Sequence, residues 1–262
     1  MKNNQKTIEE MSLYLGFKNL GQKYKHYVEK AQENQMGHIE FLEFILQEET
    51  IFRQQRCISY RIKESHLPRP YKSLSDFDFN FQPKLNRDLI KNLSTLHFLK
   101  NRESLLFAGD NGTGKSHLAQ ALALIACENM YKVLYTTCAS LITDLNYGAF
   151  EKNIEKRLRK YIVPELLIID EMGHDRLELQ ITKEAHLLFK VIDERYKLKR
   201  SLIFTTNVPE DDWAEYLGDP ISTNAILDRI FHRSAKIEIR GPSYRQYEGK
   251  ILQEKYQNLA KV

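Results

Sequence analysis

The sequence predicts an α/β protein, with a parallel sheet flanked by helices, preceded by a small all-helical N-terminal domain. From about residue 83, short apolar runs alternate with helical patterns, as in parallel strands joined by crossover helices. The runs SLLFA, LLII and LIF are continuously apolar, as in strands buried on both faces. A glycine-rich loop follows the first of them. The expected strands are Ser104–Ala108, Lys132–Thr137, Leu166–Asp170, Leu202–Thr206 and Lys236–Ile239.

The N-terminal part of the chain has a different pattern. Residues 7–66 contain no proline and carry apolar residues at helical spacing. Pro68 and Pro70 end this pattern, and the stretch SLSDFDFNF follows them. We therefore expect a helical N-terminal domain at 1–70, a linker at 71–82 and the α/β domain at 83–262.

Composition is that of an ordinary folded protein. The 262 residues are 42% hydrophobic and carry a formal charge of +4, which is too mild to indicate nucleic-acid binding by itself. Cys57, Cys127 and Cys138 lie far apart, so we expect neither a disulfide framework nor a zinc site. The polar N-terminus lacks a signal peptide, and no apolar run approaches the roughly 20 residues of a membrane helix. We expect a cytoplasmic protein that does not contact membranes.

The loop GDNGTGKS, Gly109 to Ser116, matches the phosphate-binding pattern G-x-x-x-x-G-K-[S/T] between a strand and a helix. In such a loop, backbone N–H groups bind phosphate oxygens, while Lys115 reaches the β and γ phosphates and Ser116 ligates Mg²⁺. A glycine-rich turn opening a buried helix would explain neither Lys115 nor Ser116. The sequence thus predicts binding of ATP or GTP with Mg²⁺. The expected nucleotide-binding residues are Gly109, Asp110, Asn111, Gly112, Thr113, Gly114, Lys115, Ser116 and His117.

Polar residues follow two of the later strands. Asp170 and Glu171 end the run LLII, where open α/β sheets bind their ligands. Asp170 is expected to hold Mg²⁺ with Ser116, and Glu171 to polarise the water that attacks the γ phosphate. Asn207 follows the next strand and could orient that water, or it could simply turn the chain before Pro209.

Two arginines are candidates for stabilising charge on the γ phosphate. Arg229 lies in the segment LDRI and Arg245 in GPSYR. Such an arginine acts in its own chain or in a neighbouring subunit. Either could instead form a surface ion pair, and their spacing does not decide between these roles.

At these residues the sequence resembles the IstB family, the ATP-binding helper proteins of bacterial insertion sequences. These proteins are relatives of the helicase loader DnaC in the AAA+ superfamily. The resemblance covers nearly the whole chain. Its landmarks are FDF from Phe77, GDNGTGKSHLA from Gly109, LLIIDEMG from Leu166, TTN from Thr205, Trp213, ILDRIFHR from Ile226 and GPSYR from Gly241.

The resemblance implies an AAA+ P-loop ATPase core without a C-terminal lid, and therefore ATP as the nucleotide. It also implies ATP-dependent homo-oligomers on double-stranded DNA and a partner transposase of the IstA type that is recruited and stimulated. Asn207 corresponds to the sensor-1 position. Arg229 corresponds to the arginine finger that acts on a neighbouring subunit's ATP, and Arg245 to a sensor-2 arginine.

Two segments carry excess positive charge, which could neutralise phosphates without sequence preference. The first runs from Arg53 to Lys72. The second, Lys152–Lys160, follows the second expected strand, where the DnaC-like group has an extra helix associated with DNA. The second is preferred, although a solvated helix face is the common alternative. Its expected DNA-binding residues are Lys152, Lys156, Arg157, Arg159 and Lys160. Tyr147 and Phe150 beside it could contact DNA or pack beneath the helix.

Four functions compete. The first is an ATPase that assembles on target DNA and serves a transposase, and the second is a DnaC-like replicative helicase loader with nearly the same core. A small-molecule phosphotransferase would act as a monomer without any effect of DNA. A scaffold that only binds ATP would have no use for Glu171.

Overall fold

The computed structural model describes residues 7–172, 182–209, 212–213 and 220–259. The chain divides into two compact units, Met1–Tyr60 and Arg61–Val262. The segment 71–82, which the sequence analysis treats as a linker, belongs to the second unit. No helix in the described part of the chain combines the length and apolar character needed to cross a membrane.

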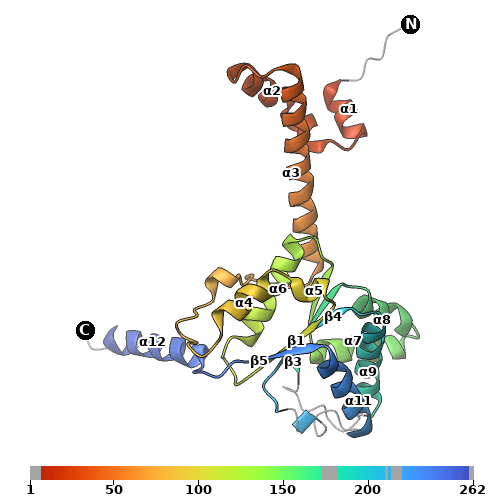
Figure 1. The fold of residues 1–262 in the computed structure, drawn as a ribbon, viewed down its shortest axis with the longest axis vertical. Coiled ribbons are helices and arrows are strands. Elements are labelled where there is room, and N and C mark those ends of the chain that lie inside the picture. Colours follow the sequence, from red (N-terminus) through yellow and green to blue (C-terminus); the bar gives the residue numbers. More distant parts are fainter. Residues whose placement is uncertain (1–6, 173–181, 210–211, 214–219, 260–262) are drawn as a thin grey trace. The chain divides into compact units, whose positions relative to one another are not determined.

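The first unit is helical, which confirms the predicted all-helical N-terminal region. It contains α1 (Ile8–Tyr14), α2 (Lys18–Glu33) and most of α3 (His38–Glu64) (Figure 1). Phe17, at the start of α2, has no side chain that can cap a helix. Instead, the buried Glu49 of α3 accepts hydrogen bonds from the backbone N–H groups of Asn19 and Leu20, both at 3.1 Å. This carboxylate satisfies free amides at the positive end of α2 and so ties α2 to α3.

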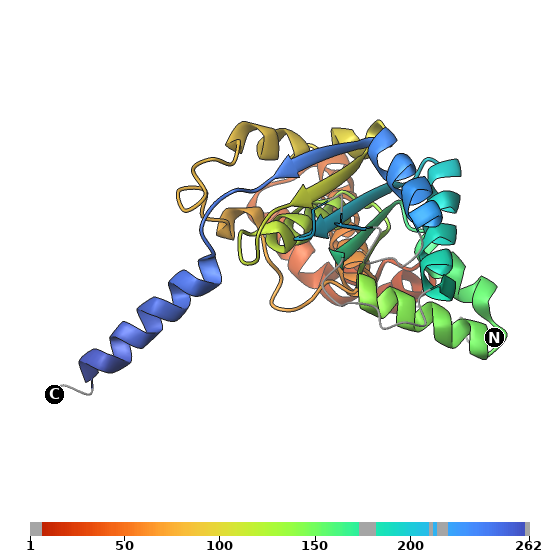
Figure 2. The same cartoon turned by 90° about the horizontal axis from the view of Figure 1, so that it is seen from below.

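The second unit contains a five-stranded parallel sheet in the order β2-β3-β4-β1-β5 (Figure 2). The α/β fold class predicted from the sequence is confirmed. In this order β3, β4 and β1 are direct neighbours, although other elements separate them along the chain. The strands are β1 (Ser104–Ala108), β2 (Val133–Thr137), β3 (Leu166–Met172), β4 (Ser201–Thr206) and β5 (Ser234–Glu238).

Helices cover both faces of the sheet, and the strands alternate between two cores. Leu105 and Phe107 of β1 belong to one core and Leu106 to the other, because successive side chains of a strand point to opposite faces. The first core packs under α4 (Arg87–Ser94), α5 (His97–Lys100) and α6 (Lys115–Glu128). The second packs under α7 (Cys138–Phe150), α8 (Ile154–Ile162), α9 (Thr182–Lys197) and α11 (Pro220–His232). A short 3-10 turn, η1 (Leu74–Asp76), precedes α4, and α12 (Tyr244–Leu259) follows β5.

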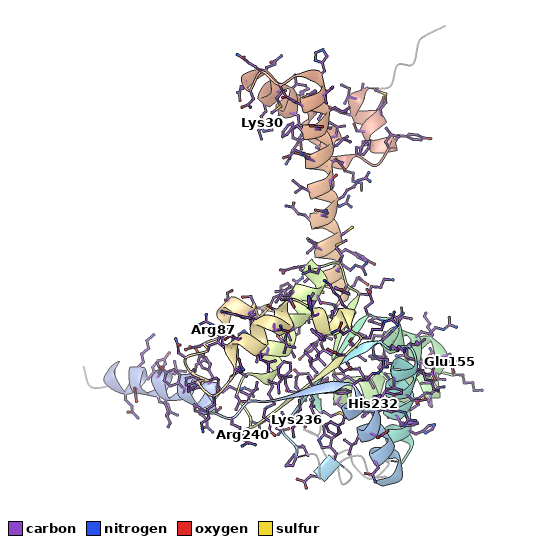
Figure 3. The ribbon with its side chains drawn as sticks, in the orientation of Figure 1. Lys30, Arg87, Glu155, His232, Lys236 and Arg240 are labelled. Carbon is purple, nitrogen blue, oxygen red and sulfur yellow. The ribbon has the colours of Figure 1, made fainter. Side chains whose placement is uncertain are left out.

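β5 forms one edge of the sheet, and its side chains are largely exposed. Lys236 and Arg240, labelled in Figure 3, both form ion pairs with Glu238, and the N–O distance from Lys236 is 3.2 Å. Only Ile237 of this strand is buried, at 4% exposure. The outer edge of the sheet therefore carries charged side chains at the end of β5, Lys236 and Glu238, and at Arg240 just after it.

A buried arginine fastens the second core. Arg195 of α9 is fully buried, and burial lowers its pKa to about 9, so it stays charged at neutral pH. Within the described residues, its guanidinium donates to backbone carbonyls, which belong to the end of α8, the loop before β3 and the first residue of β4. These acceptors are the carbonyls of Tyr161, Ile162, Pro164, Glu165 and Ser201, at 2.6 to 3.4 Å.

Replacing Arg195 by methionine should lower the free energy of unfolding by roughly 3 kcal/mol, because several buried carbonyls lose their donors at once. Chemical denaturation measures this change. Lys199→Met, at an exposed position in the turn after α9, is the matched control and should shift stability by less than about 0.5 kcal/mol. Equal stabilities of the two variants would contradict the fastening role.

Candidate nucleotide-binding site

The glycine-rich loop joins the end of β1 to the start of α6, as the sequence predicts. Gly109, Gly112 and Gly114 have backbone φ angles of 147°, 81° and 102°, which residues other than glycine rarely adopt. Thr113 closes the turn with a 2.9 Å hydrogen bond to the Asp110 carbonyl. Lys115 begins α6, and its ammonium donates to the carbonyls of Gly109 and Asp110, both at 2.7 Å. Burial lowers the pKa of Lys115, while the charge of Asp170 opposes this effect.

Close packing around the loop also requires its glycines. A Cβ atom at Gly114 would lie 2.5 Å from Cε2 of Phe77, and one at Gly112 would collide with the Ser243 hydroxyl. The Tyr244 backbone N–H donates to the Gly112 carbonyl at 2.9 Å. Segments before α4 and after β5 therefore hold the loop from two sides.

His117 fixes the segment before α4 against the loop helix. Its Nε2 lies 2.8 Å from the Ser73 carbonyl, and its ring meets the ring of Phe77 edge-on at 5.3 Å. Burial lowers the pKa of His117, which favours the neutral ring in this contact. His117 therefore shapes the wall of the site as well as lining it.

Asp170 lies in β3, two residues before its end, with only 2% of its surface exposed. Its Oδ1 accepts a 2.8 Å hydrogen bond from Ser116 and another from Thr205 of β4. Its Oδ2 accepts from the Tyr135 hydroxyl of β2. Burial, together with the charge of Asp170, raises the pKa of Tyr135 well above its usual range, so this hydroxyl stays a donor. The two predicted magnesium ligands, Ser116 and Asp170, are thus in direct contact.

Glu171 sits at an irregular point of β3. The pairing of β3 with β4 shifts between Ile169 and Met172, and Glu171 has a φ of 59°. Its backbone N–H donates to Thr205 Oγ1 at 3.0 Å, and its side chain is exposed. The bulge turns the chain so that Glu171 lines the cavity above the loop, while its neighbours Asp170 and Met172 stay buried.

Asn207 follows β4 and lines the same cavity as Glu171. The preceding Thr206 donates to the Met172 carbonyl at 2.9 Å and accepts from the Val208 N–H at 3.0 Å. These bonds fix the end of β4 beside the end of β3. Asn207 thus lies at the end of β4, next to the ends of β3 and β1, where a residue that orients the attacking water would have to lie.

A cavity of about 630 Å³ unites these groups. Its floor is the loop, Asn111 to His117, and Glu171 and Asn207 lie at the strand ends. Arg245, at the start of α12, contributes a cation to the lining. Its positive charge adds to the lowering of the Lys115 pKa by burial. Tyr71, Phe77 and Phe81 add aromatic surface from the segment before α4. The cavity thus combines a phosphate-binding loop, a cation and aromatic surface, as a nucleotide site requires.

Arg229 does not line this cavity. It lies on α11, where its Nε donates to Asp193 of α9 at 2.9 Å and its guanidinium lies 5.0 Å from the centre of the Phe189 ring. Of the two candidate arginines, the fold brings only Arg245 to the loop of its own chain.

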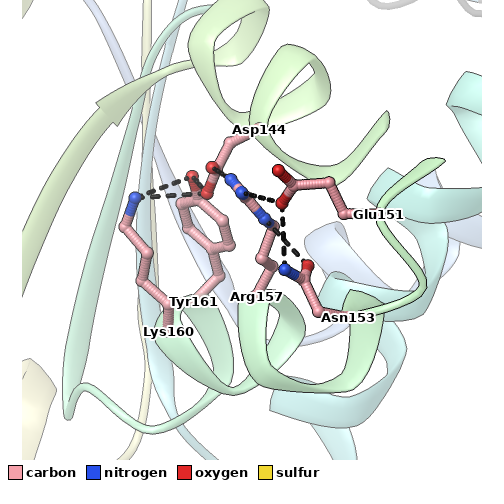
Figure 4. A network of polar contacts seen from close by, with 6 residues as sticks. All are labelled: Asp144, Glu151, Asn153, Arg157, Lys160 and Tyr161. Carbon is pink, nitrogen blue, oxygen red and sulfur yellow. Dashed lines mark hydrogen bonds and ion pairs between the residues drawn. The ribbon is translucent and has the colours of Figure 1, made fainter. Parts of the chain in front are cut away.

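The predicted DNA-binding residues lie on α8 and the turn before it, and they fall into two groups. Lys152, Lys156 and Arg159 are exposed. Arg157, which is partly buried, and Lys160, which is also exposed, pair with Asp144 of α7, and Arg157 also binds Glu151 at 2.8 Å (Figure 4). The charges of the second group are already partly neutralised within the chain.

Several residues of the site were not predicted from the sequence. Thr205 and Tyr135 bind Asp170 from neighbouring strands, and neither lies in the phosphate-loop pattern. Phe77 and Thr205 occur in the motifs FDF and TTN, and these motifs were the only indication in the sequence that the two residues belong to the site. Tyr135 lies inside an apolar strand, and nothing in its sequence context indicated a role.

The fold, loop and cavity together define a P-loop nucleotide-binding protein. The chain matches the IstB-like ATP binding protein family over residues 11–250. It is 36% identical to the insertion sequence IS5376 ATP-binding protein of Geobacillus stearothermophilus, over 90% of this chain and 92% of that protein. It is 34% identical to the corresponding IS21 protein of Pseudomonas aeruginosa, over 92% and 89%. The chain therefore belongs to the family of IstB-like ATP-binding proteins of insertion sequences, and the predicted resemblance is confirmed.

Solved structures agree on the fold. AMPPCP-bound DnaA from Aquifex aeolicus has a TM-score of 0.53 at 20% identity, over 74% of this chain and 56% of that one. DnaI has a TM-score of 0.52 at 21% identity, over 68% and 94%. These likenesses confirm the α/β fold of the second unit.

The bonds of Thr205 lead to a prediction. Thr205→Val keeps the side-chain shape but leaves the Glu171 N–H unbonded and removes one donor from buried Asp170. The free energy of unfolding should fall by roughly 1–3 kcal/mol. Thr205→Ser keeps the hydroxyl and should lie closer to the wild type in the same denaturation experiment. A valine variant as stable as the serine variant would show that these bonds contribute little.

Proposed function

We propose that the protein is an ATPase that oligomerises on double-stranded target DNA and recruits and stimulates a partner transposase of the IstA type. The observation that carries this proposal is the single cavity in which the phosphate loop, Glu171 and Asn207 meet. A protein that merely bound nucleotide would need the loop alone. A carboxylate at the strand end, beside a polar amide, is suited to activating water. The protein acts in the cytoplasm, and its helical N-terminal domain, residues 1–70, contacts the partner or DNA.

Mg²⁺ fits the pair formed by Ser116, which lines the cavity, and Asp170, which lies directly behind it. The Ser116 hydroxyl and the Asp170 carboxylate are hard oxygen donors 2.8 Å apart, and oxygen ligands are those that Mg²⁺ prefers. The bound ion would neutralise charge on the β and γ phosphates. Thr205 and Tyr135 hold the Asp170 carboxylate in place for this task.

The chain's own groups divide the work of hydrolysis. Loop amides and Lys115 bind the phosphates, Glu171 accepts a proton from the attacking water, and Asn207 orients that water. Arg245 reaches the phosphates from the same chain, since it lines the cavity. Arg229 lies outside the cavity and is assigned to a neighbouring subunit's ATP. Catalysis of this kind depends on positioning and charge stabilisation.

The nearest alternative is a DnaC-like loader of a replicative helicase. The likeness of the core to DnaI supports this alternative only at the level of the fold. The high identity to insertion-sequence proteins over nearly the whole chain favours the transposition helper. Pull-down of a transposase against a replicative helicase, with ATP and duplex DNA present, distinguishes the two.

Two substitutions separate binding from hydrolysis. Lys115→Ala removes the cation at the phosphates and should abolish ATP binding measured by calorimetry with Mg²⁺. Glu171→Gln keeps the shape and the binding but cannot take the proton, so turnover should fall by about 100-fold or more, with a longer-lived assembly on DNA. Normal turnover by the Gln variant would remove Glu171 from this role.

A shared site between subunits predicts rescue on mixing. Arg229→Ala should bind ATP normally but hydrolyse it slowly, because its neighbour lacks the arginine. Adding the Lys115→Ala variant, which retains Arg229 but binds no ATP, should restore part of the turnover. If assembly stays intact and mixing gives no rescue, Arg229 does not act between subunits.

A further inference from the structure

Phe150 is an unusual surface residue. It is 86% exposed, the highest value among the exposed large hydrophobic side chains that the structure describes. It is the last residue of α7, at the tip of the hairpin formed by α7 and α8. Tyr147, one turn earlier, is 56% exposed. Phe150 and Tyr147 together thus place aromatic surface at the tip of the hairpin, and contiguous apolar surface of this kind marks interaction sites.

The hairpin turn is short and well defined. The N–H groups of Lys152 and Asn153 donate to the carbonyls of Ala149 and Gly148, which is the Schellman pattern for ending a helix. Lys152 takes the left-handed position of this motif, with a φ of 57°. α8 then begins at Ile154. Phe150 therefore lies just before a short turn, with Lys152 beside it.

A polar network braces the hairpin from within. Arg157 of α8 bridges Asp144 and Glu151 and receives further support from Asn153 at 3.1 Å, while the Tyr161 hydroxyl donates to Asp144 at 2.7 Å (Figure 4). A Cβ atom at Gly148 would lie 2.5 Å from Cδ of Arg157, so the two helices approach closely there. The bracing holds the tip in place without burying Phe150.

The charges around the tip are unbalanced. Glu151 is engaged by Arg157, and Glu155, labelled in Figure 3, pairs with Lys190 of α9 at 3.1 Å. Lys152, Lys156 and Arg159 are exposed and have no ion-pair partner within the described residues. An apolar protein surface docking here would have to desolvate these cations without compensation. A nucleic-acid duplex offers phosphates to the cations and stacked bases to the aromatic ring.

We propose that Phe150 inserts as a wedge between adjacent base pairs of duplex DNA, while Lys152 and Lys156 bind the flanking phosphates. Apolar wedges of this kind unstack a base step and kink the duplex, and binding to the bent DNA compensates the cost. The braced hairpin suits the task, because a ring fixed in advance loses little freedom on insertion. This inference rests on the proposed function, since it requires duplex DNA at the same hairpin.

The test uses the full chain with ATP and Mg²⁺ and a short duplex that carries 2-aminopurine and a donor–acceptor dye pair at its ends. Wild-type protein should raise the 2-aminopurine fluorescence through unstacking and increase energy transfer through bending. Phe150→Ala should lose most of both signals and bind about tenfold more weakly. Phe150→Leu, which keeps an apolar wedge, should retain much of both. Tyr256→Ala, at another exposed aromatic on α12, is the matched control and should behave as wild type.

Salt dependence separates the ring from the cations. Phe150→Ala removes no charge and should leave the slope of log affinity against log salt unchanged. Lys156→Ala should reduce that slope by about one, because the variant neutralises one phosphate fewer than the wild type.

If wild-type protein bends the duplex and Phe150→Ala does so equally, the wedge is refuted while DNA binding stands. If Phe150→Ala abolishes ATP-dependent assembly without DNA, the ring serves a subunit contact and the wedge is refuted. If the wild type binds no duplex, the proposed function fails as well.

Discussion

The nucleotide site depends on one buried carboxylate, Asp170, which the fold surrounds with hydroxyl groups. Ser116 from the loop helix, Tyr135 from β2 and Thr205 from β4 all donate to it. A buried carboxylate without such donors would be strongly unfavourable, so the three elements are constrained to meet at this point. The same Thr205 hydroxyl accepts the Glu171 N–H and thereby fixes the chain one residue further on. Loop geometry, strand order and the direction of Glu171 are therefore coupled through a single side chain.

Much of the fold could be predicted from the sequence because a parallel sheet leaves a strong signal. Strands buried on both faces are apolar throughout, and SLLFA marks β1 with the observed bounds, Ser104–Ala108. The ends were harder. β3 continues to Met172, beyond the predicted Asp170, because a bulge at Glu171 lets the strand pair again after an irregular residue. β5 begins at Ser234, two residues before the predicted start, where polar side chains on an exposed edge give no apolar signal. The residue at which each of these strands begins or ends is set by its pairing with a neighbouring strand that is distant in the sequence, β1 for β5 and β4 for β3.

The candidate site was predictable where its chemistry is contiguous along the chain. Lys115, Ser116, Asp170 and Glu171 follow strands or open a helix, and parallel strands necessarily gather such residues at one edge. Thr205 and Tyr135 could not be found in this way, because their roles depend on which strands are neighbours and in what register. Similarly, the charge run on α8 did not reveal that Arg157 is used to brace α7 while Lys156 stays exposed. The fold separates Arg245, at the cavity, from Arg229, on α11, which spacing alone left undecided.

The charged outer edge of β5 has a consequence for assembly. An exposed strand with free N–H and C=O groups is a template on which a second strand can align, and charged side chains along such an edge oppose that pairing. Lys236 and Glu238 of β5, with Arg240 just after it, form ion pairs at this border of the sheet and leave one net positive charge there. A flat apolar strand from another copy would strip water from these ions and gain no compensating contact. The β5 border of the sheet is thereby protected against extension by a strand of a second copy.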